Sequence, residues 1–140
     1  MLVALVIVCV LLIGCSITKK PAIEDYTWEM RVIMHVEHGE IVYDAVSTAN
    51  DIHPEAHVIK MNLVAKNGII TITDNTNNKI YSGIYNKISN NPKGADYKIV
   101  IEDKTGHATI AMTTYANGTK EPTLPINLDN KYSMFSMRLI

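Results

Sequence analysis

Hydrophobic and polar residues alternate along most of the chain from Tyr26 onward. Over residues 26–36, one face of the predicted strand carries the larger apolar side chains: Trp28, Met30, Val32, Met34 and Val36. A period of two is typical of a β-strand that has one face in the core and the other in solvent. The pattern therefore predicts β-structure at the start of the folded part.

Turn signals at short intervals divide the rest of the chain into strands. Asn67-Gly68 is the strongest signal, because both central residues of a type I′ turn need positive φ. It joins strands predicted over 58–66 and 69–73. The other predicted strands are 41–46, 79–85, 97–102, 107–115, 123–128 and 132–139, with a loop over 86–95 and a turn over 103–106. We therefore predict an all-β single small domain, an antiparallel meander of about seven to nine short strands in a twisted sheet, sandwich or partly open barrel.

One segment, 51–68, fits two interpretations. Asp51 could cap a helix, with Pro54 and Glu55 in its first turn and Gly68 beyond its end. The apolar residues at 59, 61, 63 and 65 instead favour a strand. We predict a strand from Val58 and allow one short helix near 52–58.

The first fourteen residues differ from everything that follows. They comprise thirteen apolar residues and one glycine, whereas all 27 charged residues come later. An apolar run of this length before small residues is typical of the central region of a secretory signal peptide. An uncleaved signal anchor is the alternative interpretation.

The run ends in Leu12-Ile13-Gly14-Cys15, which resembles the lipobox of bacterial lipoproteins. The resemblance implies that residues 1–14 are removed and that Cys15 becomes a lipidated N-terminus on the extracytoplasmic face of the cell membrane. Two acyl chains anchor a protein stably, whereas one holds it only marginally. We therefore divide the chain into a signal peptide (1–14), a lipidated flexible tether (15–25) and a β-domain (26–140).

Two lysines and two cysteines add to this picture. Lys19 and Lys20 follow the lipobox, where contact with anionic headgroups is worth about 1 kcal/mol for each basic charge. Cys9 lies in the segment to be removed, and Cys15 is consumed by the lipid. The mature domain then has no thiol for a disulfide, a nucleophile or a metal site.

The sequence contains no pattern that indicates catalysis. The net charge is −1, which argues against an electrostatic nucleic-acid binder. His53 and His57 are spaced like two metal ligands on a helix, but no third ligand accompanies them. We interpret them, together with His35, Glu37 and His38, as surface groups. Phosphate-binding loops and nucleophile elbows are missing. We therefore expect no enzyme activity, no cofactor and no metal.

The segments 79–103 and 106–139 look like the C-terminal half of the immunity lipoproteins of Gram-positive lantibiotic producers, the subtilin and nisin self-protection type. The residues behind this resemblance are Ile80-Tyr81-Ser82-Gly83-Ile84-Tyr85, Asp96-Tyr97-Lys98-Ile99 and Thr113-Thr114-Tyr115-Ala116-Asn117-Gly118-Thr119-Lys120-Glu121-Pro122-Thr123-Leu124. The resemblance covers about half of the mature chain and consists of strands and turns rather than a catalytic motif.

The resemblance implies a membrane-anchored protein that binds a cationic lantibiotic peptide and so protects its producer. Seven tyrosines, and six methionines within the predicted domain, offer an adaptable contact surface. The ligand-binding residues remain unassigned at this stage. The alternatives are a lipocalin-like lipoprotein that binds a small apolar ligand inside a barrel, and a structural envelope lipoprotein without a ligand.

Overall fold

The computed structural model describes residues 19–48 and 53–139, and most of these residues lie in β-strands. One 3₁₀ turn, η1 (Ile23–Asp25), precedes the strands. The strands are β1 (Trp28–Glu37), β2 (Glu40–Val46), β3 (His57–Val58), β4 (Met61–Lys66), β5 (Ile69–Asp74), β6 (Lys79–Asn91), β7 (Gly94–Ile101), β8 (Lys104–Thr109), β9 (Ala111–Thr114), β10 (Lys120–Leu128) and β11 (Tyr132–Arg138). The expected all-β class is confirmed.

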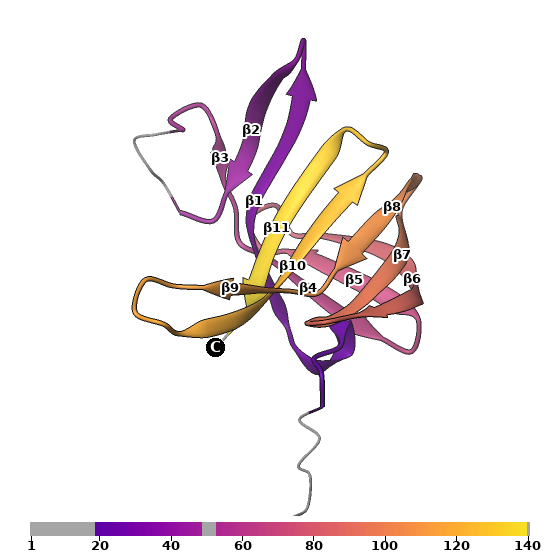
Figure 1. Ribbon diagram of the computed structural model, residues 1–140. Helices are drawn as coiled ribbons and strands as arrows, with labels where there is room; N and C mark the ends of the chain where they lie inside the picture. Colours follow the sequence, from indigo (N-terminus) through magenta and orange to yellow (C-terminus); the bar gives the residue numbers. More distant parts are fainter. Residues whose placement is uncertain (1–18, 49–52, 140) are drawn as a thin grey trace, which may run out of the picture.

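Eight of these strands form an antiparallel barrel (Figure 1). Around the barrel the order is β1, β4, β5, β6, β7, β8, β10 and β11, and pairing of β11 with β1 closes it. Three further strands extend from the wall: β2 and β3 beside β1, and β9 beside β10. In Figure 1 the described chain begins near the bottom, and the β1–β2 and β10–β11 hairpins point to the opposite end.

Strand β1 belongs to the barrel only over part of its length. Trp28 and Glu29 pair with β4, whereas the pairing from Val32 onward is with β2. The register of β1 against β11 shifts between Met30 and Val32. A β-bulge of this kind exchanges the faces of all residues beyond it. The single apolar face predicted for 26–36 is therefore wrong beyond Met30, and Ile33 rather than Val32 turns toward the barrel interior.

The end of the barrel next to η1 is closed by buried side chains. Ile23 in η1 is fully buried, and its backbone N–H donates to the Tyr97 hydroxyl at 3.1 Å. The indole Nε1 of Trp28 donates to the Ile23 carbonyl at 2.8 Å. Tyr85 packs edge-on against Tyr97 and donates to Glu24 at 2.7 Å. These contacts place Ile23 of η1 in the core, although the sequence pattern assigns residues 23–25 to a flexible tether.

The described residues 53–58 form a turn and a short strand rather than the short helix that the sequence allows near 52–58. Residues 53–56 form a single turn, in which the Ala56 N–H donates to the His53 carbonyl, and His57–Val58 is strand β3. The strand predicted from residue 58 is interrupted at 59–60 and resumes as β4. His57 and Val58 do not continue a helix. They pair in parallel with Ala45 and Val46 of β2, and this pairing joins β3 to the sheet.

The predicted loop 86–95 is also wrong, since β6 continues through Asn91 to a two-residue turn at Pro92-Lys93. The Asn91 side chain accepts the backbone N–H groups of Lys93 and Gly94 at 2.8 and 2.7 Å. That side-chain cap satisfies the turn donors, so the flanking strands can pair to their ends.

Two expected boundaries shift in the C-terminal half. The turn predicted at 103–106 is a tighter one at Glu102-Asp103, with Glu102 at a φ of 54°, and Lys104 already belongs to β8. The predicted strand 107–115 divides at Ile110, whose side chain is buried. Strands β8 and β9 then pair with different parts of β10.

No helix within residues 19–48 or 53–139 has the length and hydrophobicity needed to cross a membrane. The predicted signal peptide (1–14) and the lipidation site Cys15 lie outside the described residues. They remain predictions from the sequence.

Candidate ligand-binding site at the open end of the barrel

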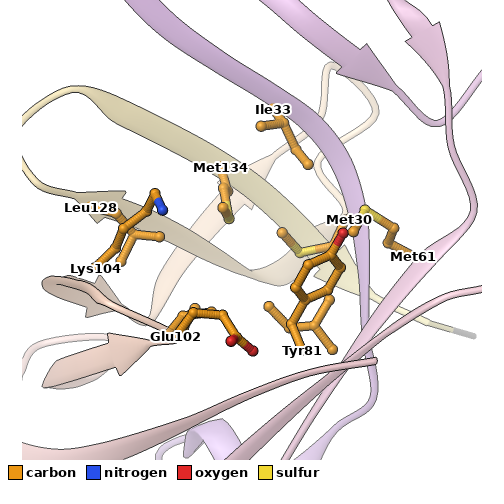
Figure 2. Close-up of a pocket in the computed structure, with 10 residues that line it drawn as sticks. Met30, Ile33, Met61, Tyr81, Glu102, Lys104, Leu128 and Met134 are labelled. Carbon is orange, nitrogen blue, oxygen red and sulfur yellow. The ribbon is translucent and has the colours of Figure 1, made fainter. Parts of the chain in front are cut away.

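An apolar cavity of about 240 Å³ lies at the end of the barrel opposite η1 (Figure 2). We call it the cup. Its lining residues come from β1, β4, β5, β6, β7, β8, β10 and β11 and from the β7–β8 turn: Met30, Ile33, Met61, Ile72, Tyr81, Ile101, Glu102, Lys104, Leu128 and Met134. All eight barrel strands therefore contribute to one cavity.

The wall of the cup consists mainly of flexible and branched apolar side chains. Figure 2 shows Met30, Met61, Met134 and Tyr81 around the cavity, with Glu102 and Lys104 along one side of it. Thioethers adapt to the shape of a bound group better than branched side chains do. Tyr81 adds an aromatic ring with a polar tip. The cup can therefore bind an apolar group and orient it through few polar contacts.

The floor of the cup is the packed core of the barrel. Trp28, Leu63, Ile99 and Ile126 are buried below it, with at most a trace of exposed surface. The cup is thus a pocket with a packed floor, and its polar lining residues Glu102 and Lys104 lie at the β7–β8 turn. A ligand larger than the cup must leave its remaining part at the mouth.

A second, more open groove of about 470 Å³ adjoins the cup between the β2–β3 edge and the β5–β6 turn. It shares Ile33 and Met61 with the cup, and Asp44 and Asp74 line its polar side. The groove exists because β1 leaves the barrel wall above Glu29 to pair with β2. Cup and groove together form a continuous surface with an apolar centre.

Carboxylates are concentrated around this open end. Those in the turns and strand ends at the mouth are Glu37, Glu40, Asp44, Asp74, Glu102, Asp103 and Asp129, and the lysines there are Lys60, Lys79, Lys104 and Lys131. The negative residues outnumber the positive ones, so the mouth attracts cations more strongly than the near-neutral chain as a whole does.

Asp74 is the buried member of this acidic group. Burial alone would raise the pKa of its carboxyl. Hydrogen bonds from the Asn77 side chain at 2.8 Å and from the backbone N–H groups of Asn77 and Thr76, together with the nearby Lys79, outweigh burial and lower the pKa. Asp74 is therefore a charged, fixed group at the edge of the groove.

His35 lies in the mouth with two of the carboxylates. Its Nδ1 is 2.8 Å from Asp44 Oδ2, and its Nε2 is 3.8 Å from Glu37. His35 and Glu37 therefore lie on the same side of β1. His53 and His57, which the sequence spaces like two ligands on a helix, are separated here by the turn at 53–56, and the ring of His53 stacks on that of Tyr43 at 3.6 Å. Among the described residues, no three His, Cys, Asp or Glu side chains are grouped so that they could hold a metal ion.

The two lysines expected at the membrane lie at the opposite, closed end of the barrel. Lys19 forms an ion pair with Asp25 at 3.0 Å, and Lys20 donates to the Asn91 carbonyl at 3.0 Å.

The sequence did not identify the residues that line the cup. Alternation shows which side chains point inward, but it does not show whether the inside is filled. The one feature of the sequence that pointed to an adaptable apolar site was its number of methionines.

No protein-family model, curated protein or solved structure matches the chain. The fold and the cup together define a class: a small eight-stranded β-barrel that is closed at one end and has a ligand-sized apolar cavity at the other.

Proposed function

We propose that this protein is a non-enzymatic binder, tethered to the outer face of the cell membrane, that takes an apolar group of a cationic amphipathic ligand into the cup. The observation that carries the proposal is the combination of a small apolar cup with an acidic mouth. Neither feature requires the other for folding. Together they match a ligand that has one apolar group next to positive charge.

The size of the cup limits what it can enclose. A dry cavity of about 150 Å³ accommodates benzene, whereas sites for whole drug-sized molecules span roughly 300–1,000 Å³. At about 240 Å³ the cup holds a group such as an indole, a branched aliphatic side chain or the end of an acyl chain. The rest of a larger ligand then lies on the groove and at the mouth.

A lantibiotic peptide fits this description, because it is cationic, amphipathic and rich in apolar side chains. The expected anchor at Cys15 would raise the local concentration of the binder where such a peptide attacks, without any new contact. We therefore propose producer self-immunity as the biological role. The resemblance of 79–103 and 106–139 to the immunity lipoproteins supports the same role.

Resistance of a sensitive Gram-positive host tests this role. Expression of the wild-type chain should raise the minimum inhibitory concentration of a lantibiotic such as nisin or subtilin. Met134→Trp, which fills the cup, and Cys15→Ala, which removes the anchor, should both abolish the increase. Ile84→Trp is the matched control, because Ile84 lies on β6 and is 53% exposed. An unchanged inhibitory concentration with the wild-type chain would show that the immunity role is wrong.

The closed barrel favours a second candidate, a lipocalin-like binder of a small apolar ligand. Displacement of an apolar fluorophore from the cup separates the two. Displacement by a cationic peptide at concentrations where a short-chain fatty acid has no effect supports the first candidate. The reverse order supports the second.

A further inference from the structure

Four lysines from three separate parts of the chain meet at the closed end of the barrel. Lys19 and Lys20 precede η1, Lys93 lies in the β6–β7 turn, and Lys120 begins β10. With Pro21, Pro92, Met112 and Thr114 they border a hollow of about 390 Å³. We call this surface the lysine face.

The backbone around the hollow is held in place by specific contacts. Lys20 Nζ donates to the carbonyl of Asn91, and the Asn91 side chain caps the turn that carries Lys93. A Cβ added to Gly94 would come within 2.9 Å of the Pro21 carbonyl, so the N-terminal chain lies directly against this turn. On the other side, Lys120 is paired with Thr114 in the β9–β10 hairpin.

The lysine face carries more positive charge than its neighbours neutralise. Lys19 is paired with Asp25, and the nearby Glu121 lies 3.9 Å from Arg138 and accepts a hydrogen bond from Tyr115. Within residues 19–48 and 53–139, the ion pairs include neither Lys93 nor Lys120. Charge of this kind at a concave surface attracts anions.

The sequence places a membrane-seeking segment next to this face. Only residues 15–18 separate Lys19 from the apolar run 1–14. Four extended residues span at most about 14 Å, which is less than two Debye lengths of about 8 Å at physiological salt. A membrane that holds residues 1–14, or a lipid on Cys15, is therefore within electrostatic range of the hollow.

We propose that the lysine face binds the headgroups of anionic phospholipids in the membrane that holds the N-terminal segment. The barrel then stands on its closed end, and the cup opens away from the membrane toward incoming ligand. Lys93 and Lys120, which are remote in sequence from the tether, are assigned to the membrane contact by this geometry. The inference rests on the membrane attachment in the proposed function, but it concerns a second surface and holds whatever the cup binds.

Lysine acetylation, read residue by residue with mass spectrometry, tests the contact on the full chain inserted in vesicles. One set of vesicles is phosphatidylcholine alone, and the other contains about one-third phosphatidylglycerol. Lys93 and Lys120 should be acetylated at least about three-fold more slowly on the anionic vesicles. Lys79 and Lys131 at the mouth should react equally on both. Salt at about 1 M, where the Debye length is about 3 Å, should remove the difference.

Charge-matched variants separate a docking surface from general attraction to the vesicle. Lys93→Gln/Lys120→Gln should remove the lipid-dependent protection of Lys20, while Lys79→Gln/Lys131→Gln should preserve it. Circular dichroism verifies that both variants are folded. Equal acetylation of Lys93 and Lys120 on the two vesicle types would overturn the proposal. So would lipid-dependent protection of Lys20 that is identical in both variants. Neither result bears on the cup, which the resistance assay tests separately.

Discussion

The indole N–H of Trp28 donates to the backbone carbonyl of Ile23 at 2.8 Å, and both residues are fully buried. The same Ile23 donates its own N–H to the hydroxyl of Tyr97 at 3.1 Å. These two bonds join η1 to opposite walls of the barrel, on β1 and β7. They satisfy polar groups that would otherwise be buried without partners. The closed end of the barrel therefore depends on one tryptophan and one tyrosine.

Replacing Trp28 by Phe should lower the free energy of unfolding by about 2–3 kcal/mol. The variant leaves the Ile23 carbonyl without its donor and leaves a void beside η1. Urea unfolding followed by circular dichroism measures the change, since the single tryptophan is lost. Tyr26→Phe is the control, because Tyr26 packs edge-on against Trp28 but is only half-buried. Equal losses in the two variants would contradict the role given to the Trp28–Ile23 bond.

Gly106 marks a place where two strands approach too closely for a side chain. A Cβ on Gly106 would overlap the backbone oxygen of Asn127 on the neighbouring β10. Gly106→Ala should therefore destabilise the barrel by about 2–3 kcal/mol, as overpacking in a core does. Thr105→Ala, one residue earlier and exposed, should change stability by less than about 1 kcal/mol. Thermal unfolding of both variants measures the difference, and a stable Gly106→Ala would show that β8 and β10 can move apart.

The sequence predicted the strands well where alternation and turn chemistry agreed. The hairpin at Asn67-Gly68 lies where predicted, with both residues at positive φ. Prediction of strand boundaries failed where a residue typical of turns serves another structural role. Gly106 was interpreted as a turn residue, but it serves close strand packing. The breakers around Pro92 suggested a long loop, but the Asn91 side chain shortens it to a two-residue turn.

The candidate site was harder to predict for a physical reason. Its residues come from all eight barrel strands, so no local stretch of sequence contains the cup. The bulge after Met30 exchanges the faces of β1, and alternation alone could not reveal it. Barrel closure depends on pairing of β1 with β11, which are about 100 residues apart. Turn signals indicate where strands end but not which distant strands pair.

Asp74 should make the barrel sensitive to acid. Its pKa is lowered in the folded protein, so its ionised form contributes stability that is present above pH 3.8, the ordinary value, and lost as the pH falls further. Asp74→Ala removes the acceptor of three hydrogen bonds and should cost about 2 kcal/mol at pH 7. The measurement is urea unfolding of wild type and variant at several pH values.

The pH dependence of unfolding also shows why Asp74→Ala loses stability. The difference between wild type and Asp74→Ala should shrink below pH 3.8, where the wild-type carboxylate becomes protonated. Asp74→Asn should retain most of the stability at pH 7, because an amide oxygen still accepts the Thr76 and Asn77 backbone N–H groups. A difference that stays constant down to pH 2.5 would show that the carboxylate charge is irrelevant.

The charge of the mouth should discriminate between cationic and uncharged ligands. Glu102 lines the cup, and its Oε1 accepts the backbone N–H of Ser82 at 3.0 Å. Glu102→Gln keeps an acceptor for that bond and removes only the charge. Binding of a cationic amphipathic peptide should weaken by about five-fold at low salt, whereas an uncharged apolar fluorophore should bind as before. Glu29→Gln is the control, because Glu29 lies on β1 with Arg31 2.8 Å away and does not line the cup. Equal weakening of peptide binding and fluorophore binding in Glu102→Gln would mean that the variant has altered the shape of the cup. The acidic mouth would then not be what selects the ligand.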